Sequence, residues 1–247
     1  MIRTKFQGLI KVGTCGFTTK HFSVFDALEV QQTFYDLVSE TTLKNWRSKA
    51  PERLEFTVKA LQVITHPATS PTYKRMKKFE GNKENFGFFR VNSDTARALE
   101  ETLREAKVLN AKVIVFQTPE SFKPTEENVR NLREFSSVLD KGFIYAWEPR
   151  GKEWDSYGGL KKLFEEIGMI HVVDPFRRKP LTEGLKYYRL HGKGRGEVNY
   201  RYKYTDDDLR ELYEMVKGQD AYVMFNNVYS FDDAKRFLEV VKSWGAR

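Results

Sequence analysis

Residues 112–148 read KVIVFQTPESFKPTEENVRNLREFSSVLDKGFIYAWE, and this stretch holds the repeating unit that decides the fold. It begins and ends with apolar runs rich in Val, Ile, Phe and Tyr, Lys112–Gln117 and Phe143–Glu148. Such runs are typical of strands buried on both faces. Between them, Thr125–Leu139 opens with the capping sequence TEEN and then repeats apolar residues at helical spacing. The stretch therefore predicts a strand, a helix and a second strand.

The same unit recurs along the chain. Further strands are predicted over Leu9–Thr14, Ala27–Gln31, Leu54–Lys59, Met169–Asp174, Leu185–His191 and Ala221–Asn226. Further helices are predicted over Ser39–Ala50, Asn92–Leu109, Trp154–Ile167, Thr205–Lys217 and Ser230–Trp244. Eight alternating units predict an α/β fold, a (β/α)8 TIM barrel made irregular by a long insertion, Ala60–Val91, after the third strand. A doubly wound open sheet is the competing architecture, but no glycine-rich phosphate loop follows the first strand.

Composition narrows the class of protein. The chain has 247 residues, of which 40% are hydrophobic and 14% aromatic, which is enough for a substantial core, and no linker divides it, so we expect a single domain over residues 1–247. No run of about 18 apolar residues and no signal peptide is evident, so we expect a cytoplasmic protein without a membrane partner. One cysteine, Cys15, excludes an intramolecular disulfide and a cysteine-only zinc site.

Polar residues occur where the apolar runs stop. The strand ends carry Lys59, Gln117, Glu148 with Arg150, Asp174, Arg189 with His191, and Asn226 with Asn227, while Glu29 lies within the second strand. By strand alternation, Glu29, Gln31 and Thr33 share one side. In a barrel the carboxyl ends of the strands converge, and barrel enzymes have their chemistry there. The sequence therefore predicts a polar pocket at that end. The alternative is that polar residues only mark where strands reach solvent.

Two carboxylates and an imidazole, Glu148, Asp174 and His191, are the candidate catalytic groups. They suit general acid–base catalysis or a hard divalent metal, so the cofactor is left open between none and such a metal. The candidate substrate-binding residues are Lys59, Gln117, Arg150, Arg189, Asn226, Asn227, Glu29 and His66.

Several of these residues have a second interpretation. Lys59 either forms a Schiff base or pairs with Glu29 or Glu148. Arg189 either clamps an anion or forms an ion pair in the core. His66, in the long insertion, either covers the pocket or stabilises a turn.

The net charge of +8 gathers in three segments. Residues 60–92, 174–186 and 192–204, here called the basic rim, carry +4, +2 and +3. The rim predicts attraction of phosphates. Tyr200–Tyr204, which reads YRYKY, interleaves rings and cations as in a single-stranded nucleic-acid track. The alternative is a solvated surface of the kind found in thermophilic proteins.

Eight short motifs also carry a family resemblance. They are Gly13–Phe17 (GTCGF), Glu29–Tyr35 (EVQQTFY), Phe56–Ala60 (FTVKA) followed by Ile64–His66 (ITH), Phe116–Pro119 (FQTP), Glu148–Arg150 (EPR), Val173–Asp174 (VD), Tyr188–Gly192 (YRLHG) and Phe225–Asn227 (FNN). In this order they resemble the YecE-like family of uncharacterised TIM barrels, known as domain of unknown function 72. The resemblance runs nearly end to end and implies the barrel fold. It implies no established activity.

The function must therefore come from the site. We expect an enzyme, a hydrolase or a lyase, that acts on a phosphate-bearing anionic substrate by acid–base or metal-assisted chemistry. One alternative is a nucleic-acid hydrolase or repair enzyme that uses the basic rim. Another is a protein that binds nucleic acid or a metabolite without turning it over.

Overall fold

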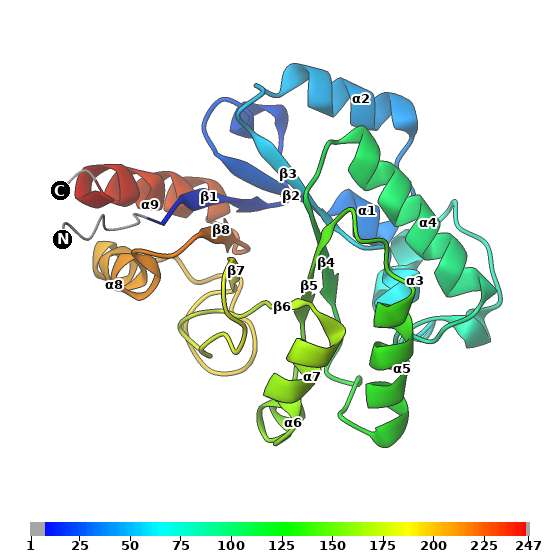
Figure 1. Ribbon diagram of the computed structural model, residues 1–247. Coiled ribbons are helices and arrows are strands. Elements are labelled where there is room, and N and C mark those ends of the chain that lie inside the picture. Colours follow the sequence, from blue (N-terminus) through cyan, green and yellow to red (C-terminus); the bar gives the residue numbers. More distant parts are fainter. Residues whose placement is uncertain (1–7, 246–247) are drawn as a thin grey trace, which may run out of the picture.

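A computed structural model of the chain describes residues 8–245 (Figure 1). The strands are β1 Ile10–Cys15, β2 Ala27–Val30, β3 Glu55–Lys59, β4 Val113–Gln117, β5 Ile144–Glu148, β6 Ile170–His171, β7 Lys186–Leu190 and β8 Ala221–Phe225. The α-helices are α1 Gln32–Tyr35, α2 Glu40–Lys49, α3 Gln62–Thr65, α4 Ser93–Val108, α5 Glu126–Ser137, α6 Lys152–Asp155, α7 Leu160–Ile167, α8 Asp206–Val216 and α9 Ser230–Gly245. Short 3-10 turns lie at η1 Thr19–His21, η2 Pro71–Arg75 and η3 Lys83–Asn85. All eight predicted strands are present, within a residue or two except at β6.

The strands pair in parallel in the order β6-β5-β4-β3-β2-β1-β8-β7, an 8-stranded sheet within residues 8–245. The last gap, between β6 and β7, is closed by a single bridge between Val173 and Tyr188. There the Val173 amide donates to the Tyr187 carbonyl at 3.4 Å, and the Arg189 amide donates to the Val173 carbonyl at 3.0 Å. The sheet is therefore a nearly closed barrel, and the predicted TIM-barrel class is confirmed.

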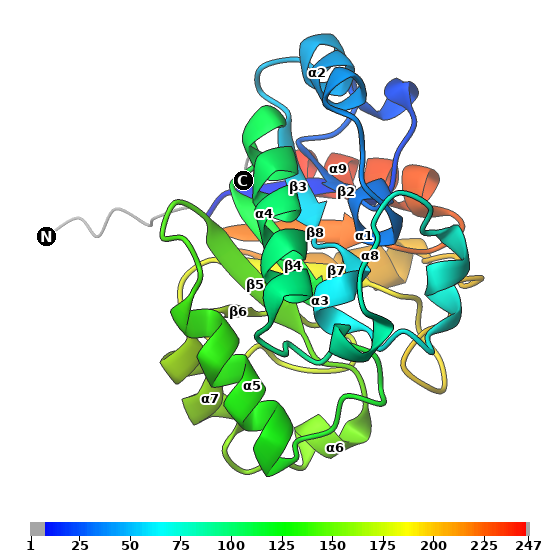
Figure 2. The same cartoon turned by 90° about the vertical axis from the view of Figure 1, so that its right-hand side faces the viewer.

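Side chains fill both faces of the sheet. Inside the barrel lie Ala27, Val113, Val115, Ala146, Val172, Tyr187, Tyr222 and Met224. The alternate residues of the same strands, such as Phe116 and Trp147, point outward and pack beneath the surrounding helices. Figure 2 shows α4 in front of the sheet, where it packs against β3. Burial on both faces explains why the strand sequences are apolar through their middles.

Most helices begin at the polar residues that the sequence marks. The Ser39 hydroxyl accepts the Thr42 amide at the start of α2, and the Thr125 hydroxyl accepts the Asn128 amide at the start of α5. Asn92 and Thr205 form capping boxes at α4 and α8. Each cap satisfies backbone donors that the first turn leaves open.

Two predictions of local structure are corrected. The helix predicted over Trp154–Ile167 is divided into α6 and α7, because Gly158 and Gly159 lie between them and glycine disfavours a helix interior. The strand alternation predicted to reach Thr33 stops at Val30, since the chain turns into α1. The Thr33 hydroxyl instead donates to the carbonyls of Val30 and Lys59, at 3.0 and 2.8 Å.

The long insertion after β3 is ordered by backbone hydrogen bonds. The amides of Gly87, Phe88 and Phe89 donate to the last carbonyls of α3, at distances of 2.7 to 3.2 Å. Gly87 has a positive φ of 84°, and a Cβ there would lie 2.4 Å from the carbonyl carbon of His66. Glycine is thus required at this close approach. The turn fixes α3 and, with it, the backbone of His66.

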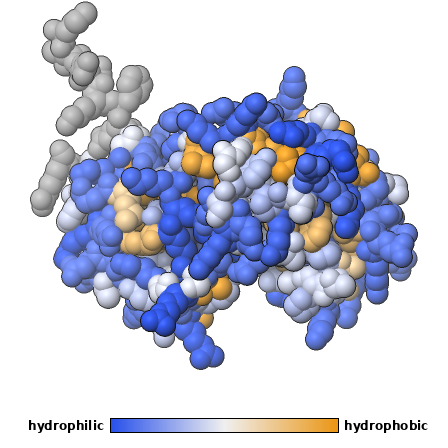
Figure 3. Space-filling view, turned by 90° about the horizontal axis from the view of Figure 1, so that it is seen from below, coloured by the Kyte–Doolittle hydropathy of each residue, from blue (hydrophilic) through white to orange (hydrophobic). Residues whose placement is uncertain are grey.

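The surface is mostly hydrophilic. Figure 3 shows one face on which hydrophobic residues gather only in separate small groups. Within residues 8–245 no helix combines the length and the apolar character needed to cross a bilayer.

Candidate functional site

A pocket of about 570 Å³ opens where the carboxyl ends of the strands converge. It is lined by Gln31, Phe34, Tyr35, Lys59, His66, Ser70, Thr72, Gln117, Pro119, Glu120, Arg150, Glu197, Val198, Tyr200, Asn226, Asn227 and Val228. Six of the predicted site residues are in that lining: Lys59, His66, Gln117, Arg150, Asn226 and Asn227. The other five do not line the pocket and are buried: Glu29, Glu148, Asp174, Arg189 and His191.

A buried ion network supports the pocket. Arg189, on β7, has no exposed surface and divides its guanidinium between two carboxylates. Its Nη1 donates to Glu148 Oε2 at 2.8 Å, and its Nη2 donates to Glu29 Oε1 at 2.9 Å. Glu29 also accepts the Tyr187 hydroxyl at 2.8 Å and the Gln31 amide. These contacts favour the core ion pair over the anion clamp for Arg189.

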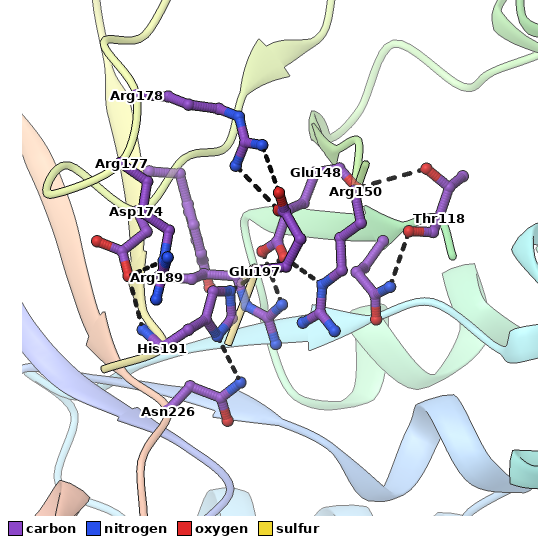
Figure 4. Close-up of polar contacts among 12 residues, drawn as sticks. Thr118, Glu148, Arg150, Asp174, Arg177, Arg178, Arg189, His191, Glu197 and Asn226 are labelled. Carbon is purple, nitrogen blue, oxygen red and sulfur yellow. Dashed lines mark hydrogen bonds and ion pairs between the residues drawn. The ribbon is translucent and has the colours of Figure 1, made fainter. Parts of the chain in front are cut away.

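Glu148 joins this network to the pocket (Figure 4). Its Oε1 accepts Arg150 Nε at 2.9 Å and lies 3.0 Å from His191 Nε2. Burial alone would raise the pKa of Glu148, but the charges of Arg189 and Arg150 hold it well below its usual range. The carboxylate is therefore ionised and already bonded, so it suits the orientation of its neighbours better than proton transfer.

His191 is held on both ring nitrogens. An ionised carboxylate only accepts, so Nε2 carries the proton toward Glu148, and Nδ1 accepts the Asn226 amide at 3.1 Å. Burial lowers the pKa of His191 to about 4, against the opposing effect of Glu148. The neutral ring therefore bonds to Glu148 on one side and to Asn226, at the pocket, on the other, and so fixes the Asn226 amide relative to Glu148.

Asp174 binds backbone. Its Oδ2 accepts the His191 amide at 2.9 Å and its Oδ1 accepts the Phe176 amide at 3.0 Å. Burial raises its pKa to about 6. Asp174 therefore fixes the end of β7 from outside the pocket lining.

Lys59 ends β3 and lines the pocket with only 5% of its surface exposed. Its Nζ lies 3.8 Å from the centre of the Phe34 ring, and no carboxylate of residues 8–245 lies within 4.0 Å of it. The two expected partners, Glu29 and Glu148, are bonded to Arg189 instead. Burial, with the charges of Arg189 and Arg150, lowers the pKa of Lys59 to about 7.

Arg150 is the second cation of the pocket. Glu148 holds its Nε, while its Nη1 and Nη2 have no acceptor among residues 8–245. Burial would lower its pKa, but Glu148 raises it, so the guanidinium stays charged. The two free Nη groups lie in the plane of the guanidinium, and this geometry suits bidentate binding of a carboxylate or a phosphate.

His66 lies beside these cations in its neutral form. Its Nδ1 is 2.8 Å from the Thr65 hydroxyl, and its ring packs edge-on against Phe34. Burial, then the charges of Lys59 and Arg150, lowers its pKa to about 3. The ring offers a polar edge to the pocket without adding charge.

The amide side chains divide into two kinds. Gln117 donates to the Thr118 carbonyl at 2.9 Å, and its carbonyl oxygen has no partner in the described chain. Asn226 bonds to His191, as above. The Asn227 amide donates to the Tyr202 carbonyl at 2.8 Å and to the Asp233 carboxylate at 2.7 Å. Both donors of Asn227 are thus used to hold neighbouring parts of the chain.

Several residues of the lining were not among the predicted site residues. Phe34 and Tyr35 come from α1, Ser70 and Thr72 from the insertion, and Tyr200 from the loop after β7. The motif Glu29–Tyr35 contained a signal for Phe34 and Tyr35, since both follow directly after a strand end. The insertion shows no periodicity that would place Ser70 or Thr72.

The divalent metal that the sequence leaves open as a cofactor finds no ligand set among residues 8–245. Within residues 8–245 no group of three or more His, Cys, Asp or Glu side chains is arranged to hold an ion. The carboxylates of Glu148 and Asp174 already accept hydrogen bonds from protein donors.

Part of the basic rim is bonded within the protein. Arg177 donates to the carbonyls of Gly192 and Gly196, and Arg178 pairs with Asp155 and Glu197. Lys193 pairs with Asp208 and Glu211. In the YRYKY stretch, the Tyr202 hydroxyl donates to Asp208 and the Tyr204 hydroxyl accepts the Gly192 amide. Arg177, Arg178, Lys193 and two of the tyrosines are therefore bonded within the protein, whereas Arg201 and Lys203 of the same stretch form no ion pair in residues 8–245.

Comparison with known proteins gives a family match over most of the chain. The model of a family described as protein of unknown function DUF72 matches residues 18–246. The UPF0759 protein YunF of Bacillus subtilis (strain 168) is 25% identical over 254 residues, which cover 89% of this chain and 84% of that protein.

Solved structures share the fold. A DUF72 family protein from Enterococcus faecalis superposes with a TM-score of 0.72 at 18% identity, covering 97% of this chain and 98% of that one. Endonuclease IV from Thermus thermophilus gives a TM-score of 0.50 at 11% identity, covering 96% and 97%. At these identities the likeness concerns the barrel alone.

Proposed function

This chain belongs to the DUF72 family of proteins of unknown function, and we propose that it is an enzyme acting on a small anionic substrate in the pocket at the carboxyl ends of its strands. Arg150 binds the anionic group, and Lys59 moves a proton to or from the reacting part. One observation carries the proposal: two cations line the same pocket, and their outermost nitrogens have no acceptor in residues 8–245.

The binding half of the proposal rests on Arg150. Glu148 fixes its Nε, so the guanidinium is oriented before any ligand arrives. A preoriented fork loses little side-chain entropy on binding a carboxylate or a phosphate. Since Glu148 is itself held by Arg189, the buried network acts on the substrate through Arg150.

The chemical half rests on Lys59. With a pKa of about 7, its amine is present in both protonation states at neutral pH. A group of this kind serves as general acid or general base. Glu148 and His191 are then positioning residues, and a direct part for them or for Asp174 in proton transfer stays a prediction.

A ligand screen tests the proposal. Phosphate-bearing and carboxylate-bearing metabolites are tested for their effect on Tm with the wild type and with Arg150→Gln. We expect anionic compounds to raise the Tm of the wild type and not that of R150Q. Neutral analogues of the same compounds are the control.

Turnover separates an enzyme from a binding protein. Compounds that pass the screen are incubated with the wild type and with Lys59→Met, and conversion is followed by NMR. We expect conversion by the wild type and none by K59M, which should still bind them. Binding without conversion of any hit would favour the non-catalytic alternative.

The nucleic-acid alternative makes a different prediction. It requires affinity for oligonucleotides that falls steeply with salt, carried by the basic rim. The internal pairing of Arg177, Arg178 and Lys193 leaves fewer cations for that purpose. Fluorescence anisotropy with single-stranded and double-stranded DNA at two salt concentrations distinguishes it from a small-molecule site.

A further inference from the structure

Lys59 is unusual among buried lysines because it lacks an anionic partner. Only 5% of its surface is exposed. Within residues 8–245 its Nζ has no hydrogen bond or ion pair, and its one aromatic contact is with the Phe34 ring. A buried ammonium without a carboxylate is costly, and release of its proton relieves that cost. Arg189 and Arg150 add to the cost by their charges.

The neutral form of this amine is a nucleophile. About half of Lys59 is neutral at pH 7, whereas only about one in 2,500 molecules of an ordinary lysine is. Lys59 lines the pocket, as does the Phe34 ring against which its amine lies. Its strand fixes its backbone, and Phe34 limits where the side chain can lie.

The neighbours of Lys59 suit addition to a carbonyl. Arg150 offers two donors to an anionic substituent, so a substrate would be anchored beside the amine. His66 and Gln117 line the same pocket as neutral polar groups, able to hydrogen-bond the oxygen of an adduct. The pocket thus combines a nucleophile, an anion site and uncharged polar groups.

We propose that Lys59 forms a Schiff base with an aldehyde or ketone that also carries a carboxylate or a phosphate held by Arg150. The neutral amine adds to the carbonyl carbon, forming a C–N bond, and the carbonyl oxygen takes up a proton. The nitrogen then loses one proton, the hydroxyl takes up a second proton and leaves as water with the C–O bonding pair, and the nitrogen lone pair forms the C=N bond of a protonated imine. No electrons are exchanged with a co-reactant. This inference rests on the proposed function and names its substrate class.

Reductive trapping tests the inference. The wild-type chain is incubated with borohydride and pyruvate, glyoxylate, glyceraldehyde 3-phosphate or dihydroxyacetone phosphate, and adducts are located by peptide mass spectrometry. We expect one main adduct, on Lys59, labelled at least about tenfold more than any other lysine. The carboxylate and phosphate probes show which anion the site takes. Absence of any Lys59 adduct, or labels spread over exposed lysines, would overturn the inference.

Variants separate the possible failures. Lys59→Met should abolish the adduct, and Lys161→Met, at an exposed lysine, should keep it. Arg150→Gln should remove the preference for anionic over neutral carbonyl compounds. If phosphate still binds in an Arg150-dependent way but no imine is trapped, the Schiff base fails and the proposed function stands. If neither occurs, both fail.

Discussion

At the scale of single residues, the chemistry of the pocket depends on which cations pair with the carboxylates of Glu29 and Glu148. Glu29 and Glu148 both bond to Arg189, which leaves Lys59 without a counterion. Had either carboxylate turned to Lys59, its amine would be an ordinary charged lysine. The reactivity that we assign to Lys59 is therefore a consequence of the neighbouring pairing.

The titration of Lys59 follows from this pairing. Its reductive methylation by formaldehyde should rise with a midpoint near pH 7, because burial lowers its pKa to about 7. In Arg150→Met the midpoint should move to higher pH, since one of the charges that lower the pKa is gone. Peptide mass spectrometry at a series of pH values measures both. A midpoint above pH 10 in the wild type would contradict the account.

Removal of Glu148 should destabilise the protein strongly. Glu148→Gln leaves Arg189 with Glu29 alone and Arg150 without an ion pair in residues 8–245, and loss of one partner in a buried pair costs about 3 kcal/mol. Urea unfolding measures this loss. Glu153→Gln, at an exposed pair with Lys123, is the control and should change stability little. Equal effects of the two substitutions would argue against the network.

Single residues also mark the limit of sequence reasoning. Lys59, Gln117 and Asn226 could be predicted at the pocket because each ends an apolar run. That Arg189 bonds to both Glu29 and Glu148 could not be predicted. Strand alternation tells on which face of the sheet a side chain lies, but not which residue it contacts. For the same reason the sequence suggests Glu29 or Glu148 as a partner for Lys59, which neither is.

At the scale of elements, Glu105 on α4 is a buried acid with an incomplete shell. Its Oε1 accepts the Val38 amide at 2.7 Å, while its Oε2 is buried without a hydrogen-bond partner in the described chain. Burial raises its pKa to about 8. The helix therefore carries a protonated carboxyl at neutral pH, which links α4 to the segment before α2.

This acid predicts a pH dependence of stability. Because its folded pKa lies above the unfolded value of 4.5, the folded state retains the proton longer, and stability is lost as pH rises through about 8. From pH 5 to 9 the wild type should lose about 2 to 4 kcal/mol more than Glu105→Gln. Chemical unfolding at both pH values measures this difference. Glu100→Gln, at an exposed position of the same helix, should behave like the wild type.

Elements were predicted well where local signals decide them. Helix caps at Ser39, Asn92, Thr125 and Thr205 fixed the starts of four helices. The extent of β6 was predicted poorly, because Met169–Asp174 is apolar through most of its length, yet only Ile170–His171 form a ladder. How far a strand pairs depends on the neighbour across the seam, which local sequence does not specify.

At the scale of the whole molecule, the barrel closes unevenly. β1 and β8 pair over five positions, whereas the chain just after β6 meets β7 at one bridge, between Val173 and Tyr188. Fewer cross-strand hydrogen bonds make local opening easier. The Asp174 contact to the His191 amide lies beside this seam.

Hydrogen exchange should reveal the seam. The Val173 amide, with its 3.4 Å contact, should exchange faster than the buried Ala60 amide, which donates to the Val115 carbonyl of β4 at 2.9 Å. Two-dimensional NMR of the exchanging protein gives both rates at the residue level. Equal protection of Val173 and Ala60 would mean that the barrel is closed as firmly there as elsewhere.

The convergence of strand ends into one pocket is the claim on which the rest depends, and phosphate binding tests it most directly. Calorimetric titration with inorganic phosphate is carried out on the wild type, on Arg150→Gln and on the double variant Arg195→Gln, Arg201→Gln, which removes exposed cations of the basic rim. We expect R150Q to weaken binding by at least about tenfold, since charge-assisted hydrogen bonds contribute more than about 1.4 kcal/mol. The rim variant should bind nearly as the wild type does. Loss of binding in the rim variant with R150Q unaffected would place anion recognition on the outer surface and contradict the account.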